Sequence, residues 1–149
     1  MPPARTSICK DNIQSWIENS LSESLNIFNN LPPCPYAKQA WMSNKVLLLE
    51  DENPQDCVDL LQNYEVIIYA YNPKDITADQ LHSLCREISN DSIVALDDHP
   101  DNVEKVGDII LNNGTYALIL VQERHKLEQA RKILRAKGYY TNWDPEYLE

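Results

Sequence analysis

The densest group of side chains that could carry out chemistry is the run Asp-Asp-His-Pro-Asp at residues 97–101. Asp97, Asp98, His99 and Asp101 follow the apolar segment Ser-Ile-Val-Ala-Leu, and functional residues often gather just past the end of a buried strand in α/β proteins. A histidine beside carboxylates can act as an acid, a base or a metal ligand. Asp and Pro also favour turns, so a solvated turn without a function is the alternative.

A second candidate region is the segment Pro-Pro-Cys-Pro-Tyr-Ala-Lys-Gln-Ala-Trp at residues 32–41. Its cysteine could be a reactive or ligating thiolate if a lysine or the histidine lay beside it. The alternative is that the cysteine and the tryptophan are core residues, which is the more common role of a free Cys and a lone Trp. The catalytic candidates are Cys34, Asp98 and His99, and the binding candidates are Tyr36, Lys38, Trp41, Asp97 and Asp101. A site requires Cys34 to lie close to His99.

The sequence Cys-Pro-Tyr-Ala at residues 34–37 is similar to the Cys-Pro-Tyr-Cys motif of glutaredoxins, with Ala37 in place of the second cysteine. A glutaredoxin places this motif after a strand, whereas here a long helix is expected before it. A dithiol cycle also requires a nearby resolving cysteine. The sequence therefore argues against a glutaredoxin function.

Three short stretches resemble the uncharacterised DUF1415 family: Trp-Ile-Glu at 16–18, Asn-Asn-Leu at 29–31 and Cys-Pro-Tyr-Ala at 34–37. Members of that family carry Asn-Leu-Cys-Pro-Phe-Ala after a similar N-terminal helix. They also carry a His-Pro pair after a strand, which would correspond to His99 and Pro100. The resemblance implies a site at these residues and does not name a reaction.

Metal and phosphate sites have little support in the sequence. His82 and Cys85 are three residues apart on an expected helix, but a metal site would need further ligands. We expect Cys85 in the core and His82 in solvent. The glycines Gly107, Gly114 and Gly138 are scattered, so no phosphate-binding loop is indicated. No metal site is predicted, and a cofactor remains open.

The chain of 149 residues is long enough for one domain, with loosely ordered tails expected at 1–11 and 144–149. Its net charge of −10 disfavours binding to nucleic acid or to anionic lipid. No apolar run reaches the length of a membrane span and no secretory leader is visible, so we expect a cytoplasmic protein. The cysteines should then be free thiols; they are Cys9, Cys34, Cys57 and Cys85.

Apolar spacing and capping residues predict an alternation of helices and strands. The expected order is helix 12–29, strand 45–50, a short helix after Asn53-Pro54, strand 65–71, a helix capped by Thr77, strand 92–96, strand 115–122, a helix ending at Gly138 and strand 139–143. From residue 65 onward this order predicts a ferredoxin-like βαββαβ sandwich, of the α+β class, preceded by an additional helix and a strand-helix unit. A doubly wound parallel sheet is the alternative. Segment 103–114 is either a short helix or a hairpin around Asn113-Gly114.

Two functions fit these observations. A non-catalytic adaptor or regulatory protein would bind a protein partner through a sheet edge or an acidic surface. The alternative is a small-molecule or metal-dependent enzyme, with a site built from residues 34–38 and 97–101. No complete catalytic constellation is present in the sequence, which favours the adaptor. We expect neither a nucleic acid nor a membrane as partner, and the oligomeric state is open.

Overall fold

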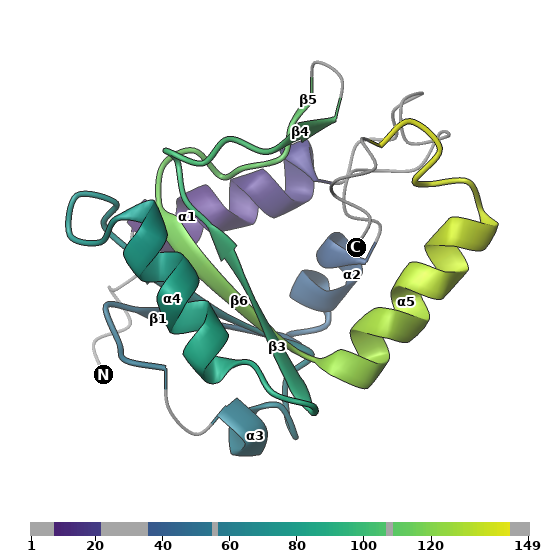
Figure 1. Cartoon of the computed structure of the whole chain (residues 1–149), viewed down its shortest axis with the longest axis horizontal. Coiled ribbons are helices and arrows are strands. Elements are labelled where there is room, and N and C mark those ends of the chain that lie inside the picture. The colour runs from purple at the N-terminus through teal and green to yellow at the C-terminus, as the bar shows by residue number, and fades with distance from the viewer. Residues whose placement is uncertain (1–7, 22–35, 55–56, 107–108, 144–149) are drawn as a thin grey trace.

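The computed structural model describes residues 8–21, 36–54, 57–106 and 109–143 as a mixed α/β fold (Figure 1). Helices lie on both faces of a four-stranded mixed sheet. In chain order the elements are α1 (Ile8–Ser15), the π-helical turn η1 (Trp16–Ser20), α2 (Ala37–Met42), β1 (Val46–Glu50), α3 (Cys57–Leu60), β2 (Val66–Tyr71), α4 (Ala78–Ile88), β3 (Ile93–Asp98), β4 (Lys105–Val106), β5 (Ile109–Ile110), β6 (Ala117–Glu123) and α5 (Arg124–Ala136).

The strand order of the sheet is β1-β2-β6-β3. β1 runs parallel to β2, with Val46 opposite Val66. β6 is antiparallel to both of its neighbours, β2 and β3. β2 and β3 are therefore parallel to each other, and the antiparallel strand β6 separates them while α4 connects them. This arrangement is a split βαβ unit, and it excludes a purely parallel doubly wound sheet.

The strand expected at residues 139–143 is wrong, because these residues form turns after α5. Gly138 has a positive φ of 78°, which suits a glycine at the end of a helix. Tyr139 is buried and packs with Val106 and Leu134 in a small core of its own. The aromatic residues of this segment therefore anchor a turn and not a strand. The sheet position beside β2 is occupied by β1.

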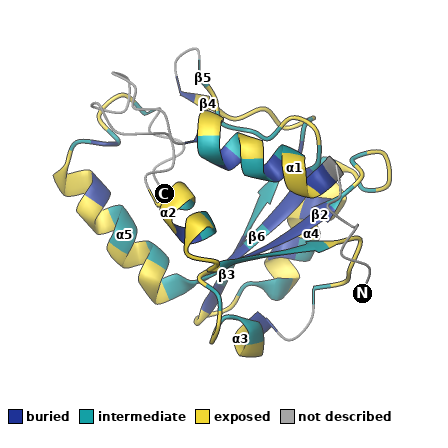
Figure 2. Ribbon diagram, turned by 180° about the vertical axis from the view of Figure 1, so that it is seen from behind, coloured by how far each residue is buried: buried dark blue, intermediate teal, exposed yellow. Residues whose placement is uncertain are grey.

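Each face of the sheet has its own apolar core, as the alternation of side chains along a strand requires. Ile67 and Tyr69 of β2 face the core that α3 and α4 cover. Ile68 and Ala70 of the same strand face the core that α1, η1 and α2 cover. All four are at most 3% exposed, which explains the unbroken apolar run of β2 and confirms its expected central position. Figure 2 shows the burial in the central strands and the exposed outer surfaces of the helices.

Two other segments differ from expectation. The N-terminal helix begins at Ile8, before the expected residue 12, and passes into η1 at Trp16; residues 22–29 lie outside the described residues. The described residues of segment 103–114, which are 103–106 and 109–114, form neither the short helix nor a hairpin around Asn113-Gly114. The segment contains the two-residue strands β4 and β5, which pair antiparallel with Lys105 opposite Ile110.

The helix start expected at Thr77 is confirmed, with both hydrogen bonds of a capping box. The Gln80 N–H donates to Thr77 Oγ1 at 3.1 Å, and the Thr77 N–H donates to Gln80 Oε1 at 2.9 Å. We therefore expect Thr77→Ala to lower the free energy of unfolding by about 1 kcal/mol in urea titrations. Thr77→Ser keeps the hydroxyl and serves as the control. A serine variant as unstable as the alanine variant would contradict this account of the cap.

Candidate functional site

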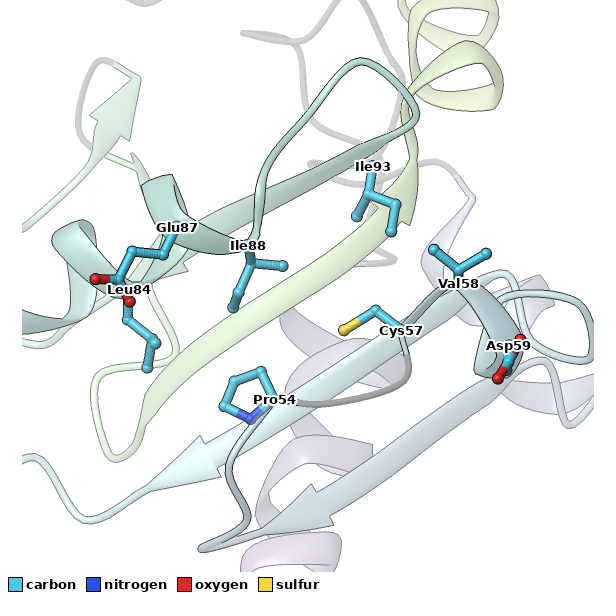
Figure 3. A pocket seen from close by; sticks show the side chains of 8 residues that line it. All are labelled: Pro54, Cys57, Val58, Asp59, Leu84, Glu87, Ile88 and Ile93. Atoms are coloured by element: carbon cyan, nitrogen blue, oxygen red, sulfur yellow. The ribbon is translucent and has the colours of Figure 1, made fainter.

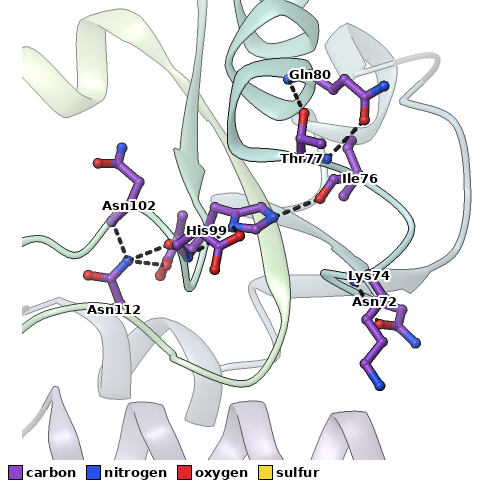
Figure 4. Close-up of polar contacts among 10 residues, drawn as sticks. Asn72, Lys74, Ile76, Thr77, Gln80, His99, Asn102 and Asn112 are labelled. Carbon is purple, nitrogen blue, oxygen red and sulfur yellow. Dashed lines mark hydrogen bonds and ion pairs between the residues drawn. The ribbon is translucent and has the colours of Figure 1, made fainter.

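His99 is a buried residue immediately after β3, with an exposed fraction of 2%. Its Nε2 lies 2.7 Å from the carbonyl oxygen of Ile76, and its Nδ1 accepts a hydrogen bond of 3.0 Å from the Asp101 N–H. Because Nδ1 is an acceptor, the neutral ring carries its proton on Nε2, which donates to Ile76. Figure 4 shows the ring directed at Ile76, next to the cap of α4. Both ring nitrogens thus connect the end of β3 to the start of α4.

Asp98 is the last residue of β3, so the strand extends two residues beyond the expected end at 96. Its Oδ1 accepts from the Asn112 side-chain amide at 2.9 Å, and its Oδ2 accepts from the Asn113 N–H at 3.1 Å. Burial raises the pKa of the Asp98 carboxyl above its usual range, although these two hydrogen bonds lower it. The Asp98 carboxylate therefore holds residues 112 and 113 against β3.

Asp97 points to the opposite face of the sheet from Asp98, because successive strand residues alternate. Its Oδ2 lies 3.5 Å from Nδ1 of His82, an exposed residue of α4. The pKa of the thiol of Cys85, a residue of α4, is raised first by burial and then by the charge of Asp97. The two adjacent carboxylates therefore belong to different surroundings and do not form a catalytic pair.

Glu104 is a third carboxyl group near the end of β3. Its pKa is raised, first by partial burial and then by the charges of Asp98 and Asp97. Its backbone N–H donates to the side-chain oxygen of Asn112. The loop after β3 therefore collects negative charge, which the backbone and the asparagine amides offset by hydrogen bonding.

Asn112, which Figure 4 shows, and Asn113 hold this loop together, a role that the sequence analysis missed. The Asn112 amide lies within hydrogen-bond distance of the His99 and Asn102 carbonyl oxygens, at 3.1 and 3.0 Å, as well as of Asp98. Asn113 donates from its amide to Asn12 Oδ1 on α1 at 2.8 Å. The Asn-Asn-Gly run at residues 112–114 could have indicated this role, but the sequence analysis interpreted it only as a turn.

The segment at residues 32–41 is described from residue 36 onward, so Cys34 and its distance from His99 lie outside the described residues. Trp41 packs in the core beneath α1 and α2, as the alternative interpretation of this residue expected. Tyr36 and Lys38 are exposed at the start of α2. No hydrogen bond or ion pair among the described residues connects them with Asp98 or His99. α2 leads into the start of β1, whereas Asp98 ends β3 at the opposite end of the sheet.

Cys9 and Cys85 are buried cysteines, and their surroundings disfavour the thiolate form. Burial raises the pKa of Cys9 to about 11 and that of Cys85 to about 12. Because only the thiolate reacts with alkylating reagents, we expect Cys9 and Cys85 to resist iodoacetamide at mildly alkaline pH and to react after denaturation. Peptide mass spectrometry of the labelled chain measures this. Equal labelling of Cys85 in native and denatured protein would refute the described burial.

No cluster of three or more His, Cys, Asp or Glu side chains suited to a metal ion occurs among the described residues. None of the helices in the described part of the chain is both long and apolar enough to cross a membrane. Comparison with protein-family models, curated proteins and solved structures found no match to the chain. The resemblance to the DUF1415 family accordingly stays a prediction.

Proposed function

We propose that this chain is a non-catalytic binding module that holds a basic amphipathic helix of a protein partner. The binding surface is the groove between α3 and α4, which we call the α3–α4 groove. The observation that carries the proposal is the combination of an apolar floor and an acidic rim in this groove.

The α3–α4 groove consists of a middle hollow between α3 and α4 and two adjoining hollows, one bordered by α4 and the other by α3. The middle hollow has Cys57 and Val58 of α3 on one side and Ile88 and Ile93 on the other (Figure 3). It shares Leu84 and Glu87 with the hollow toward Tyr71, and Val58 and Ile93 with the hollow toward Glu123. Val58 is 59% exposed, which is unusual for a valine beside a core and leaves apolar surface for a partner.

The rim of the groove is acidic. Its carboxylates are Asp59, Asp75, Asp79, Glu87, Asp91 and Glu123. Lys126 is the one lysine among the described lining residues, and its Nζ lies 3.7 Å from Glu123. A surface with one sign of charge around an apolar floor is complementary to a helix with apolar residues on one face and lysines or arginines beside them. The net charge of −10 adds a long-range attraction for such a partner.

Two observations make the alternative function, that of an enzyme, less favourable. The ring nitrogens of His99 are engaged by Ile76 and Asp101, so neither is positioned to transfer a proton to a substrate. Asp97 and Asp98 lie on opposite faces of the sheet, where they cannot share one substrate. An enzyme using these residues would have to break the contacts that join β3 to α4.

We also propose a ferredoxin-like relationship for the sheet and a cytoplasmic location for the chain. The unit β2-α4-β3-β6 supports a ferredoxin-like relationship in which β1 takes the sheet position of the final strand but runs parallel to β2, where the ferredoxin-like strand would be antiparallel. A cytoplasmic location is supported by the free thiols of Cys9, Cys57 and Cys85. Neither assignment is needed for the groove to bind a helix.

The proposal is tested with a pair of fluorescein-labelled peptides of about 15 residues, a length at which a designed sequence can form a helix in water. Both carry leucine at helical spacing; one has lysine and the other glutamate at all remaining positions. In fluorescence anisotropy we expect the lysine peptide to bind, with an affinity that falls as salt is added, and the glutamate peptide not to bind. Equal binding of both peptides, or binding of neither, would sink the proposal.

A further inference from the structure

We propose that the chain forms a two-fold symmetric dimer through the free edge of β1, and that the occupant of this edge is a second copy of the same chain. The two β1 strands pair antiparallel with Leu48 opposite Leu48, and the two sheets join into one. This inference is independent of the α3–α4 groove, because it uses the edge of the sheet and not a face.

The two edges of the sheet differ in their protection. At the β3 edge, Ile93 N–H donates to Asn90 Oδ1 at 2.9 Å, and Ala95 N–H donates to Ser89 Oγ at 2.9 Å. Arg124 also approaches the Ile93 carbonyl oxygen at 3.4 Å. These contacts occupy backbone groups in the first half of β3 that an added strand would need.

The β1 edge has no such protection within the part of the chain that the structure describes. Its residues 46–49 are Val-Leu-Leu-Leu, each half-buried and without a proline, and the one charged residue of β1 is Glu50 at its exposed end. Natural proteins usually block an edge strand with prolines, inward-pointing charges or bulges. An apolar edge left open is therefore expected to have a partner strand.

The hydrogen bonds between β1 and β2 show which backbone groups of β1 point away from the sheet. The Asp51 N–H donates to the Ala70 carbonyl oxygen at 3.0 Å, and the Val66 N–H donates to the Lys45 carbonyl oxygen at 3.2 Å. Odd-numbered residues of this segment therefore bond to β2. The amides and carbonyls of Val46, Leu48 and Glu50 point away from β2, and no hydrogen bond to them occurs among the described residues.

These outward groups fit a two-fold axis at Leu48. With Leu48 opposite its own copy, Val46 stands opposite Glu50 of the second copy, and each such pair exchanges both backbone hydrogen bonds. The same register brings Lys45 next to Asp51 of the second copy on both sides of the axis, where Asp51 follows the strand with a positive φ of 54°. The apolar centre and the opposite charges at its two ends make the edge self-complementary, as a closed two-fold interface requires.

Sedimentation equilibrium of the full chain tests the dimer and its register. We expect a reversible monomer–dimer equilibrium, with a dissociation constant raised about tenfold by either Lys45→Asp or Asp51→Lys. The double variant restores opposite charges and is expected to return to within about threefold of the original chain. A chain that is monomeric at all concentrations would overturn the proposal, as would a dimer that is insensitive to both single reversals.

Amide hydrogen exchange measured by NMR provides a second test that does not depend on variants. At concentrations favouring the dimer we expect the amides of Val46, Leu48 and Glu50 to become protected, whereas those of Leu47 and Leu49 are protected at every concentration. Leu48→Pro removes an outward N–H that β2 does not use and should abolish dimerisation. If Leu48→Pro does not fold, the concentration dependence of the exchange pattern still decides the matter. An unchanged pattern across the concentration range would refute the β1 pairing.

Discussion

His99→Ala is expected to lower the free energy of unfolding by about 3–5 kcal/mol, the range for a buried side chain that leaves both a cavity and unpaired polar groups. The side chain is 2% exposed, and its loss leaves the Ile76 carbonyl oxygen and the Asp101 N–H without the bonds that they make to it. The first of these lies next to Thr77, the cap of α4. Urea denaturation followed by tryptophan fluorescence measures the change.

Two comparison variants separate this structural role from a general effect of removing a histidine. His82 is exposed and lies 3.5 Å from Asp97, so His82→Ala should cost less than about 1 kcal/mol. An asparagine at residue 99 can accept the Asp101 N–H in an Asx turn, so His99→Asn should be more stable than His99→Ala. A His99→Ala variant as stable as His82→Ala would show that His99 does not hold the fold together.

Glu87→Lys is expected to weaken binding of the lysine peptide about tenfold, because it places a like charge where two hollows of the groove meet. Glu87→Gln, which only removes the charge, should have a smaller effect. The difference in peptide affinity between the two variants should become smaller at high ionic strength, because residue 87 is exposed and salt screens its charge. Fluorescence anisotropy titrations at two salt concentrations measure both effects.

The matched control for the groove is Glu128→Lys, the same charge reversal on the exposed surface of α5. Beyond its first residues, of which His125 and Lys126 border the hollow toward Glu123, α5 extends away from the face that α3 and α4 cover (Figure 1). If the peptide is drawn only by the net charge of the protein, Glu128→Lys and Glu87→Lys will weaken binding equally. That outcome would rule out the α3–α4 groove as the specific site.

Local signals in the sequence predicted the central sheet well. The apolar run of β2 indicated a strand covered on both faces, and Thr77 with Gln80 indicated the start of α4, because each depends on neighbouring residues alone. The pairing of β1 with β2 could not be predicted in this way. It depends on which strand occupies the open side of β2, and residues 139–143 had a comparable strand pattern. Packing of Tyr139 against Val106 and Leu134 decided between them.

The candidate site was only partly predictable for a similar reason. The sequence placed Asp97, Asp98 and His99 just past the end of a strand, whereas the structure has Asp97 and Asp98 in the strand itself and only His99 after it. It did not indicate that the strand continues through Asp98, which sends the two carboxylates to opposite faces. It also did not show that Asn112, far along the chain, would supply the amide that binds Asp98 and the adjoining backbone. The groove was missed because its apolar and acidic residues come from separate segments that only the fold brings together.

Backbone amide chemical shifts, recorded as the lysine peptide is added to the isotopically labelled chain, test the proposed binding surface most directly. The account predicts that the largest changes occur in Cys57–Leu60 and Ala78–Ile88, the two helices that border the groove. Changes confined to α1, α2 or α5, with α3 and α4 unaffected, would contradict it.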